Sequence, residues 1–127
     1  MGRLSLLIFL LCWLFTSNIH AQPAENWDHE IVTASQRFAI PSAWIRAAIE
    51  VESGGKQDAV SSAGAMGLMQ LMPATWAELR QRYGFGSDPF NPRDNILAGT
   101  AYLREMYDRF GYPGLFAAYH AGPGRYE

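Results

Sequence analysis

The sequence predicts an all-α domain. Apolar side chains recur at three- and four-residue spacing in several segments, which is the pattern of helices with one buried face. Clusters of glycine and proline separate these segments, and no run of alternating apolar and polar residues marks a strand. We expect at most a minor ribbon or turn near residues 59–65.

The first two helices are expected over residues 27–38 and from residue 41 to about residue 53. Asn26 is a suitable N-cap for the first helix, which has the apolar stripe Trp27, Ile31, Ala34 and Phe38. In the second, Pro41 suits the first turn and Ser42 can bond free backbone amides. The glycine pair at 54–55 ends it.

Three more helices follow. One should run from Pro73 to about Tyr83, and one from near Asp94 to the residue before Gly111. A short last helix is expected over 115–121, ended by the glycines and proline at 122–124. The inner stripe of the long helix is Ile96, Gly99, Leu103, Met106, Tyr107 and Phe110.

Length and charge limit the class of protein. The chain has 127 residues, of which 49% are hydrophobic and 17% are charged, so we expect one globular domain rather than a disordered chain. Ten Lys and Arg stand against 12 Asp and Glu, and this balance gives no electrostatic reason to expect nucleic-acid binding.

Residues 1–21 have the pattern of a secretory signal peptide. Arg3 precedes an apolar run over 4–15, and polar residues and Ala21 follow. The run is shorter than the roughly 17–25 residues that span a bilayer. We therefore expect cleavage after Ala21, no stable membrane anchor, and a periplasmic or secreted domain over residues 22–127. An uncleaved anchor and a lipidated Cys12 are the alternatives.

Glu52 is the residue that the helical pattern singles out. It falls within about 20° of Ile45 when each residue turns the helix by about 100°. Glu50 and Arg46 fall on the opposite face, where we expect them to form an exposed ion pair. A carboxylic acid in apolar surroundings holds its proton more tightly than in water and can donate it near neutral pH. Glu52 is thus a candidate general acid; alternatively, it turns outward or bonds to loop amides.

A compact glycine-punctuated segment over residues 64–73 follows that helix. Gln70 is the side chain in it with both donor and acceptor capacity. It either forms a polar site with Glu52 or satisfies backbone groups of the loop. Trp27, Trp44 and Trp76 could stack on sugar rings, but their helical spacing favours core packing.

Four motifs in order resemble the soluble lytic transglycosylase family. They are Glu52-Ser53, residues 64–73 (GAMGLMQLMP), residues 95–103 (NILAGTAYL) and residues 118–124 (AYHAGPG). The resemblance implies a lysozyme-like helical domain that cleaves peptidoglycan glycan strands between N-acetylmuramic acid and N-acetylglucosamine and leaves a 1,6-anhydro ring. Small members of this type serve secretion or conjugation apparatus, so proteins of such an apparatus are expected partners.

The resemblance also assigns site residues. Glu52 matches the single catalytic acid and base, while Ser53, Gln70 and Tyr119 match residues that bind the glycan. No cofactor is implied. His120 stands where family members usually have asparagine, and we treat it as a tolerated exchange. Family domains usually continue beyond the last motif, so a C-terminally truncated domain is one interpretation of residues 22–127.

A second catalytic carboxylate is not evident. Asp58, Asp88 and Asp94 each suit a turn or a helix cap. His29 and His120 lack the spacing of a zinc site, so no metal is expected. The missing carboxylate favours attack assisted by the N-acetyl group of the substrate. Alternatives are a hydrolytic muramidase in which Asp58 or Asp94 activates water, and a catalytically inactive glycan-binding or assembly subunit.

Overall fold

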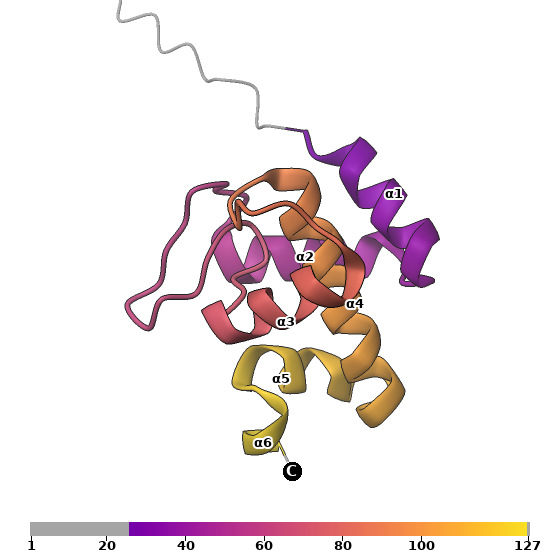
Figure 1. Cartoon of the computed structure of the whole chain (residues 1–127). Coiled ribbons are helices and arrows are strands. Elements are labelled where there is room, and N and C mark those ends of the chain that lie inside the picture. The colour runs from indigo at the N-terminus through magenta and orange to yellow at the C-terminus, as the bar shows by residue number, and fades with distance from the viewer. Residues whose placement is uncertain (1–25, 127) are drawn as a thin grey trace, which may run out of the picture.

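The computed structural model describes residues 26–126, and this part of the chain is all-α, as the sequence predicts. Its helices are α1 (Asp28–Phe38), α2 (Ser42–Ser53), α3 (Pro73–Tyr83), α4 (Pro92–Phe110), α5 (Gly114–Ala121) and α6 (Pro123–Tyr126). Figure 1 shows α1 at one end of the domain and α5 with α6 at the other. The predicted signal peptide over 1–21 lies outside the described residues.

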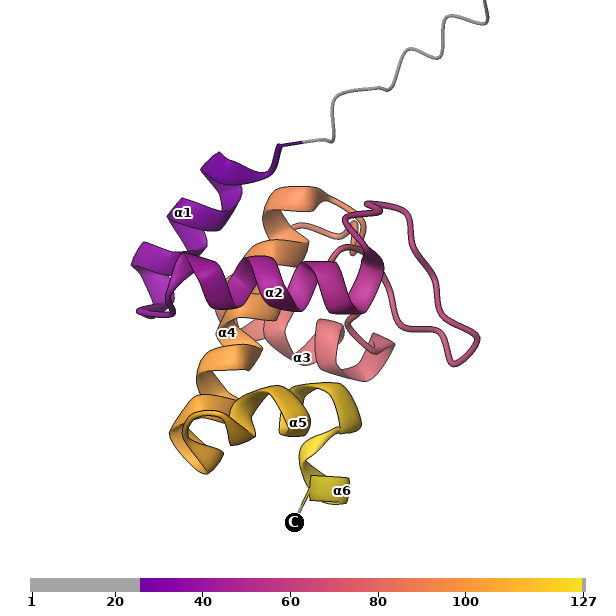
Figure 2. The same ribbon diagram turned by 180° about the vertical axis from the view of Figure 1, so that it is seen from behind.

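The segment between α2 and α3 projects from one side of the domain in both views (Figures 1 and 2). Two isolated antiparallel bridges, Val60 with Met66 and Met66 with Leu71, fold it back on itself. The sequence predicts a minor ribbon near 59–65, and the bridges extend this feature to residue 71.

Helix α4 is the centre of the core. It packs against α1, α3 and α5, and Figure 2 shows it passing behind α2. Its first turn is well determined by the sequence, because Pro92 needs no amide partner there and the Asn91 side chain accepts a hydrogen bond from the Asp94 N–H at 3.1 Å. Most side chains from Asp94 to Met106 are buried. A helix of this length therefore provides the surface on which the shorter helices pack.

Several helix ends differ from prediction. Helix α1 begins at Asp28, whose N–H is 3.0 Å from Oδ1 of Asn26, so Asn26 acts one residue outside the N-cap position. Ser42 begins α2 but makes no side-chain capping bond, so that prediction was wrong. The chain was expected to stop being helical at 122–124. Instead, Gly122 alone breaks the path at φ +85°, and Pro123 starts α6, because proline is favoured in a first turn.

Two predictions made from helical spacing were also wrong. Arg46 forms an ion pair with Asp28 of α1 rather than with Glu50, because the fold brings the opposite charge of another helix within reach. Tyr107 lies at the rim of the core rather than inside it. Its ring packs 5.7 Å from that of Trp44, and the Arg104 guanidinium lies over it. A tyrosine suits this place because its apolar ring packs while its hydroxyl stays in water.

The three tryptophans pack in or against the core, as predicted. Trp76 is buried, while Trp27 and Trp44 are half-buried against the cluster of core side chains. Within residues 26–126 no helix has the length and apolar character that crossing a membrane requires. In the same residues no three His, Cys, Asp or Glu side chains gather as a metal site would need.

Candidate active site

Glu52 lies in the last turn of α2 and points into a small pocket between α2 and α5. Its side chain is only 12% exposed, so the prediction that it lies on the inner side of its helix is confirmed. The pocket has a volume of about 180 Å³. Its other lining residues are Ala47, Ala48, Val51, Phe116, Tyr119 and His120. The carboxyl group therefore has mainly apolar neighbours.

His120 is the polar partner of that carboxyl group. Its Nδ1 lies 2.9 Å from Oε1 of Glu52, although 68 positions separate the two residues in sequence. The imidazole itself is 69% exposed. From the sequence, His120 was treated only as a tolerated exchange. Its contact with Glu52 could not be predicted, because the distance between the ends of α2 and α5 depends on how both helices pack.

Tyr119 lies next to this pair and is buried. Its hydroxyl donates a hydrogen bond of 2.7 Å to the carbonyl of Met69, and its ring packs 5.2 Å from that of Tyr102. Burial, and then the charge of Glu52, raises the pKa of Tyr119 well above its usual range. Tyr119 thus remains a neutral donor, and it ties α5 to the loop that carries Gln70.

Gln70 bonds to the backbone of its own loop. Its Nε2 donates to the carbonyls of Ala59 at 3.1 Å and of Gly67 at 3.0 Å, which is the second of the two interpretations that its sequence context allows. The backbone of Gln70 has φ +51°, in the left-handed region. Gln70 is not among the residues that line the Glu52 pocket.

Ser53 completes the end of α2. Its hydroxyl donates to the carbonyl of Ile49 at 3.1 Å and accepts from the N–H of Gly55 at the same distance. The structure therefore brings Glu52, Tyr119 and His120 together, whereas the side chains of Ser53 and Gln70 bond to the surrounding backbone. The roles of Ser53, Gln70 and Tyr119 in glycan binding stay predictions.

Asn95 holds the loop in place and was not singled out as a site residue. It is fully buried in α4; its Oδ1 accepts from the N–H of Met69 at 2.8 Å, and its Nδ2 donates to the carbonyls of Met66 and Pro89. The backbone of Met69 is thus held at its N–H by Asn95 and at its carbonyl by Tyr119. The signal in the sequence was an amide within the apolar stripe of a helix, since a buried amide needs partners.

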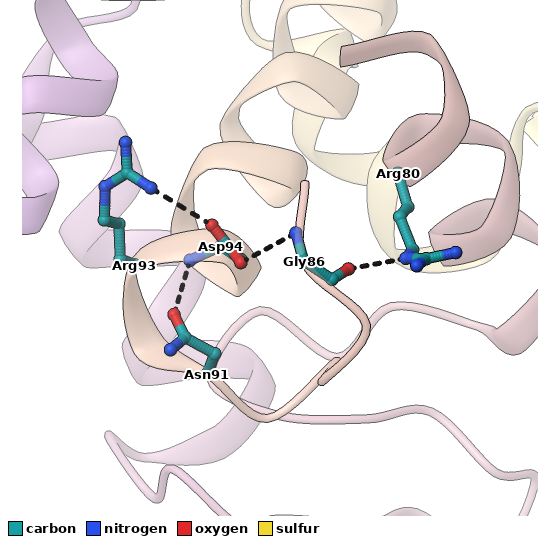
Figure 3. A network of polar contacts seen from close by, with 5 residues as sticks. All are labelled: Arg80, Gly86, Asn91, Arg93 and Asp94. Atoms are coloured by element: carbon teal, nitrogen blue, oxygen red, sulfur yellow. Dashed lines mark hydrogen bonds and ion pairs between the residues drawn. The ribbon is translucent and has the colours of Figure 1, made fainter. Parts of the chain in front are cut away.

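Asp88 and Asp94 have structural roles, as predicted. Figure 3 shows Asp94 between two segments, where its carboxylate accepts from the Gly86 N–H at 3.1 Å and from Arg93 at 3.4 Å. Oδ1 of Asp88 accepts from the Phe90 N–H at 2.9 Å. Asp58 is exposed on the loop after α2. None of the three aspartates lines the Glu52 pocket among the residues that the structure describes.

The model of the family described as Transglycosylase SLT domain matches residues 30–127. The Transglycosylase of Enterobacteria phage PRD1 is 37% identical over 100 residues, which are 78% of this chain and 36% of the phage protein. The Soluble lytic murein transglycosylase of Escherichia coli strain K12 is 39% identical over 93 residues, which are 68% of this chain and 14% of that protein. The chain therefore spans well under half of either relative.

Solved structures show the same fold. The 70 kDa soluble lytic transglycosylase of E. coli superimposes with a TM-score of 0.71 and 33% identity, covering 79% of this chain and 17% of that one. An inactive mutant of the lytic transglycosylase Slt of Pseudomonas aeruginosa, with glutamate changed to glutamine, gives a TM-score of 0.71 and 38% identity, covering 77% of this chain and 17% of that one.

Proposed function

Because the chain belongs to the transglycosylase SLT domain family, we propose that it is a peptidoglycan lytic transglycosylase. It cleaves the β-1,4 bond between N-acetylmuramic acid and N-acetylglucosamine and forms a 1,6-anhydromuramoyl end. The observation that carries this proposal is the placement of Glu52, a nearly buried carboxyl group in a pocket that, among the residues that the structure describes, is lined by no second carboxylate.

Glu52 acts first as a general acid. Its carboxyl group donates a proton to the glycosidic oxygen, and the bond from that oxygen to C1 of the muramoyl residue breaks. The N-acetyl carbonyl of the same sugar stabilises the positive charge that develops at C1. Glu52 is left as a carboxylate.

The same residue then acts as a base. The Glu52 carboxylate takes the proton of the C6 hydroxyl, and O6 bonds to C1 to close the anhydro ring. The proton count of Glu52 is restored after each turnover, so one carboxyl group suffices. Ordinary glycosidases need two carboxyl groups because a water molecule or an enzyme nucleophile must attack C1.

One solved relative supports dependence on a glutamate. A glutamate-to-glutamine mutant of the Pseudomonas enzyme is described as inactive. We extend that dependence to Glu52, which lies in the last turn of α2.

Gln70, Ser53 and Tyr119 are proposed to bind the glycan. The hydrogen bonds to Ala59 and Gly67 use the amide N–H groups of Gln70, so its carbonyl oxygen is the atom available to accept from a sugar hydroxyl. Tyr119 lines the pocket beside Glu52. Ser53 follows Glu52 in the last turn of α2, and this position beside the acid supports the same role.

The test compares two substitutions on one helix. Glu52→Gln removes the acid and keeps the shape of the side chain, whereas Glu50→Gln makes the same change on the exposed face two residues away. We expect Glu50→Gln to release anhydromuropeptides from purified sacculi at the unmodified rate and Glu52→Gln to release none. Equal release by both variants, measured by mass spectrometry, would contradict the assignment of Glu52.

A hydrolytic muramidase and an inactive glycan-binding subunit are the other outcomes of this experiment. Hydrolysis leaves reducing muramic acid ends and needs a water-activating base; Asp94 is bonded to Gly86, and Asp58 is exposed on its loop. An inactive subunit retains sacculi without releasing fragments. We further propose that the chain is exported and opens peptidoglycan for a secretion or conjugation apparatus, and loss of assembly on deletion of the gene tests this.

A further inference from the structure

The contact between Glu52 and His120 constrains where protons lie. When Glu52 is a carboxylate, the 2.9 Å contact requires a proton on Nδ1 of His120, in either a neutral ring or an imidazolium. When Glu52 holds the proton, its hydroxyl can donate to an unprotonated Nδ1. The imidazole is exposed and exchanges protons with solvent, whereas the carboxyl group is mostly covered.

The fold fixes this contact rather than leaving it to a mobile surface side chain. Tyr119, the residue before His120, is anchored by its hydrogen bond to the Met69 carbonyl. Met69 in turn is held by Asn95 of α4. The last turn of α5 is therefore anchored to this loop and to α4, and from it the imidazole of His120 reaches the Glu52 carboxyl group.

His120 faces Glu52, and histidine is the side-chain type whose charge ordinarily changes between about pH 5 and pH 8. Tyr119 stays neutral there because burial raises its pKa well above the usual range. Burial, and then Glu105, also raises the pKa of Tyr102, which lies behind Tyr119. The charged side chains on the neighbouring segments are exposed to solvent, which screens them: Lys56, Asp58 and Arg125.

We propose that His120 regulates the acid form of Glu52 according to pH. This rests on the proposed function. The first chemical step needs a proton on Glu52, and an imidazolium in hydrogen-bond contact favours the carboxylate instead. A neutral ring removes that bias and keeps a nitrogen in contact with Oε1. His120 therefore acts as a positioning residue that restrains the reaction at mildly acidic pH and ceases to do so as pH rises.

The test replaces the ring by side chains that never carry charge. His120→Asn keeps an N–H donor and His120→Ala removes it. We expect the initial rate of anhydromuropeptide release by His120→Asn to exceed that of the unmodified protein at pH 5, by up to about tenfold, because an imidazolium held against the carboxyl group favours the charged form, which cannot donate the first proton. The ratio should fall to near one by pH 8, and His120→Ala should show the same fall at lower rates.

A merely structural role of His120 changes the rate by one factor at every pH. A ratio that does not vary with pH would therefore overturn the proposal while leaving the proposed function intact. Absence of anhydromuropeptides at every pH would instead contradict the proposed function.

A second measurement tests the coupling without catalysis. NMR titration follows the His120 ring in the unmodified protein and in Glu52→Gln, with His29 on α1 as an internal control. We expect the midpoint of the His120 signal to be lower in Glu52→Gln than in the unmodified protein, because removing a contacting negative charge disfavours the imidazolium. The His29 midpoint should not move. An unchanged His120 midpoint would overturn the coupling of the two residues.

Discussion

The hydrogen bond between Tyr119 and Met69 offers a quantitative test of how the site is held. Tyr119→Phe keeps the ring and removes the hydroxyl that donates to the Met69 carbonyl at 2.7 Å. The site is buried, so the carbonyl loses its partner without gaining free access to water. A buried group left unsatisfied costs about 1–3 kcal/mol. We therefore expect the free energy of unfolding to fall by that amount at pH 7.

The difference in unfolding free energy between the unmodified protein and Tyr119→Phe should also change with pH, in a defined direction. The pKa of Tyr119 is raised in the folded state, so its contribution to stability is present below the unfolded pKa of about 10 and is lost as pH rises above it. Up to about 1.4 kcal/mol is lost per pH unit in that range. The difference between the unmodified protein and Tyr119→Phe should therefore shrink between about pH 9 and pH 11.

Urea unfolding at these pH values measures both effects. Tyr112→Phe is the matched control, because Tyr112 is exposed and its ring stacks on Trp44 at 5.1 Å in a way that phenylalanine preserves. A Tyr119→Phe protein as stable as the control at pH 7, or a difference that does not change with pH, would refute this reasoning.

Three further predictions concern the loop and the acid. Gly67→Ala should lower the free energy of unfolding by about 2 kcal/mol or more, because the added Cβ would lie 2.4 Å from Nδ2 of Asn95 and the residue has φ +77°. Gly64→Ala is the control: its Cβ would meet open space, so the loss measured by the same urea titration should be smaller. Asn95→Asp keeps the oxygen that accepts from Met69 but replaces the Nδ2 donor by an oxygen, which leaves the two carbonyls without a partner. The free energy of unfolding, measured in urea, should therefore fall by about 2–6 kcal/mol, and a fall below about 1 kcal/mol would contradict this. Glu52→Gln should melt at or above the temperature of the unmodified protein in a thermal scan, since functional sites commonly sacrifice stability; a large decrease would mean that Glu52 has a structural role.

The sequence predicted what depends on local spacing. The bounds of α3 and the inward direction of Glu52 follow from helical periodicity and from glycine and proline positions. Contacts between helices could not be predicted from local spacing. Arg46 pairs with Asp28 because α1 and α2 meet there, and His120 meets Glu52 only once α5 has packed beside α2.

The loop that carries Gln70 shows the same limit. Its composition predicted a compact segment. In the structure, hydrogen bonds from Asn95, which lies much later in the chain on α4, hold this segment in place. The predicted inner stripe of the long helix began at Ile96 and did not include Asn95, and spacing alone could not show which backbone groups this amide would bind. An amide on an apolar stripe is the general sign of such an anchor.

The claim that one carboxyl group performs both proton transfers is tested most directly by digesting purified sacculi in water labelled with heavy oxygen. Intramolecular closure of the ring predicts muramoyl ends that lack one water and contain no heavy oxygen. Reducing muramoyl ends that carry the label would contradict it, because the attacking oxygen would then have come from solvent through a second catalytic group.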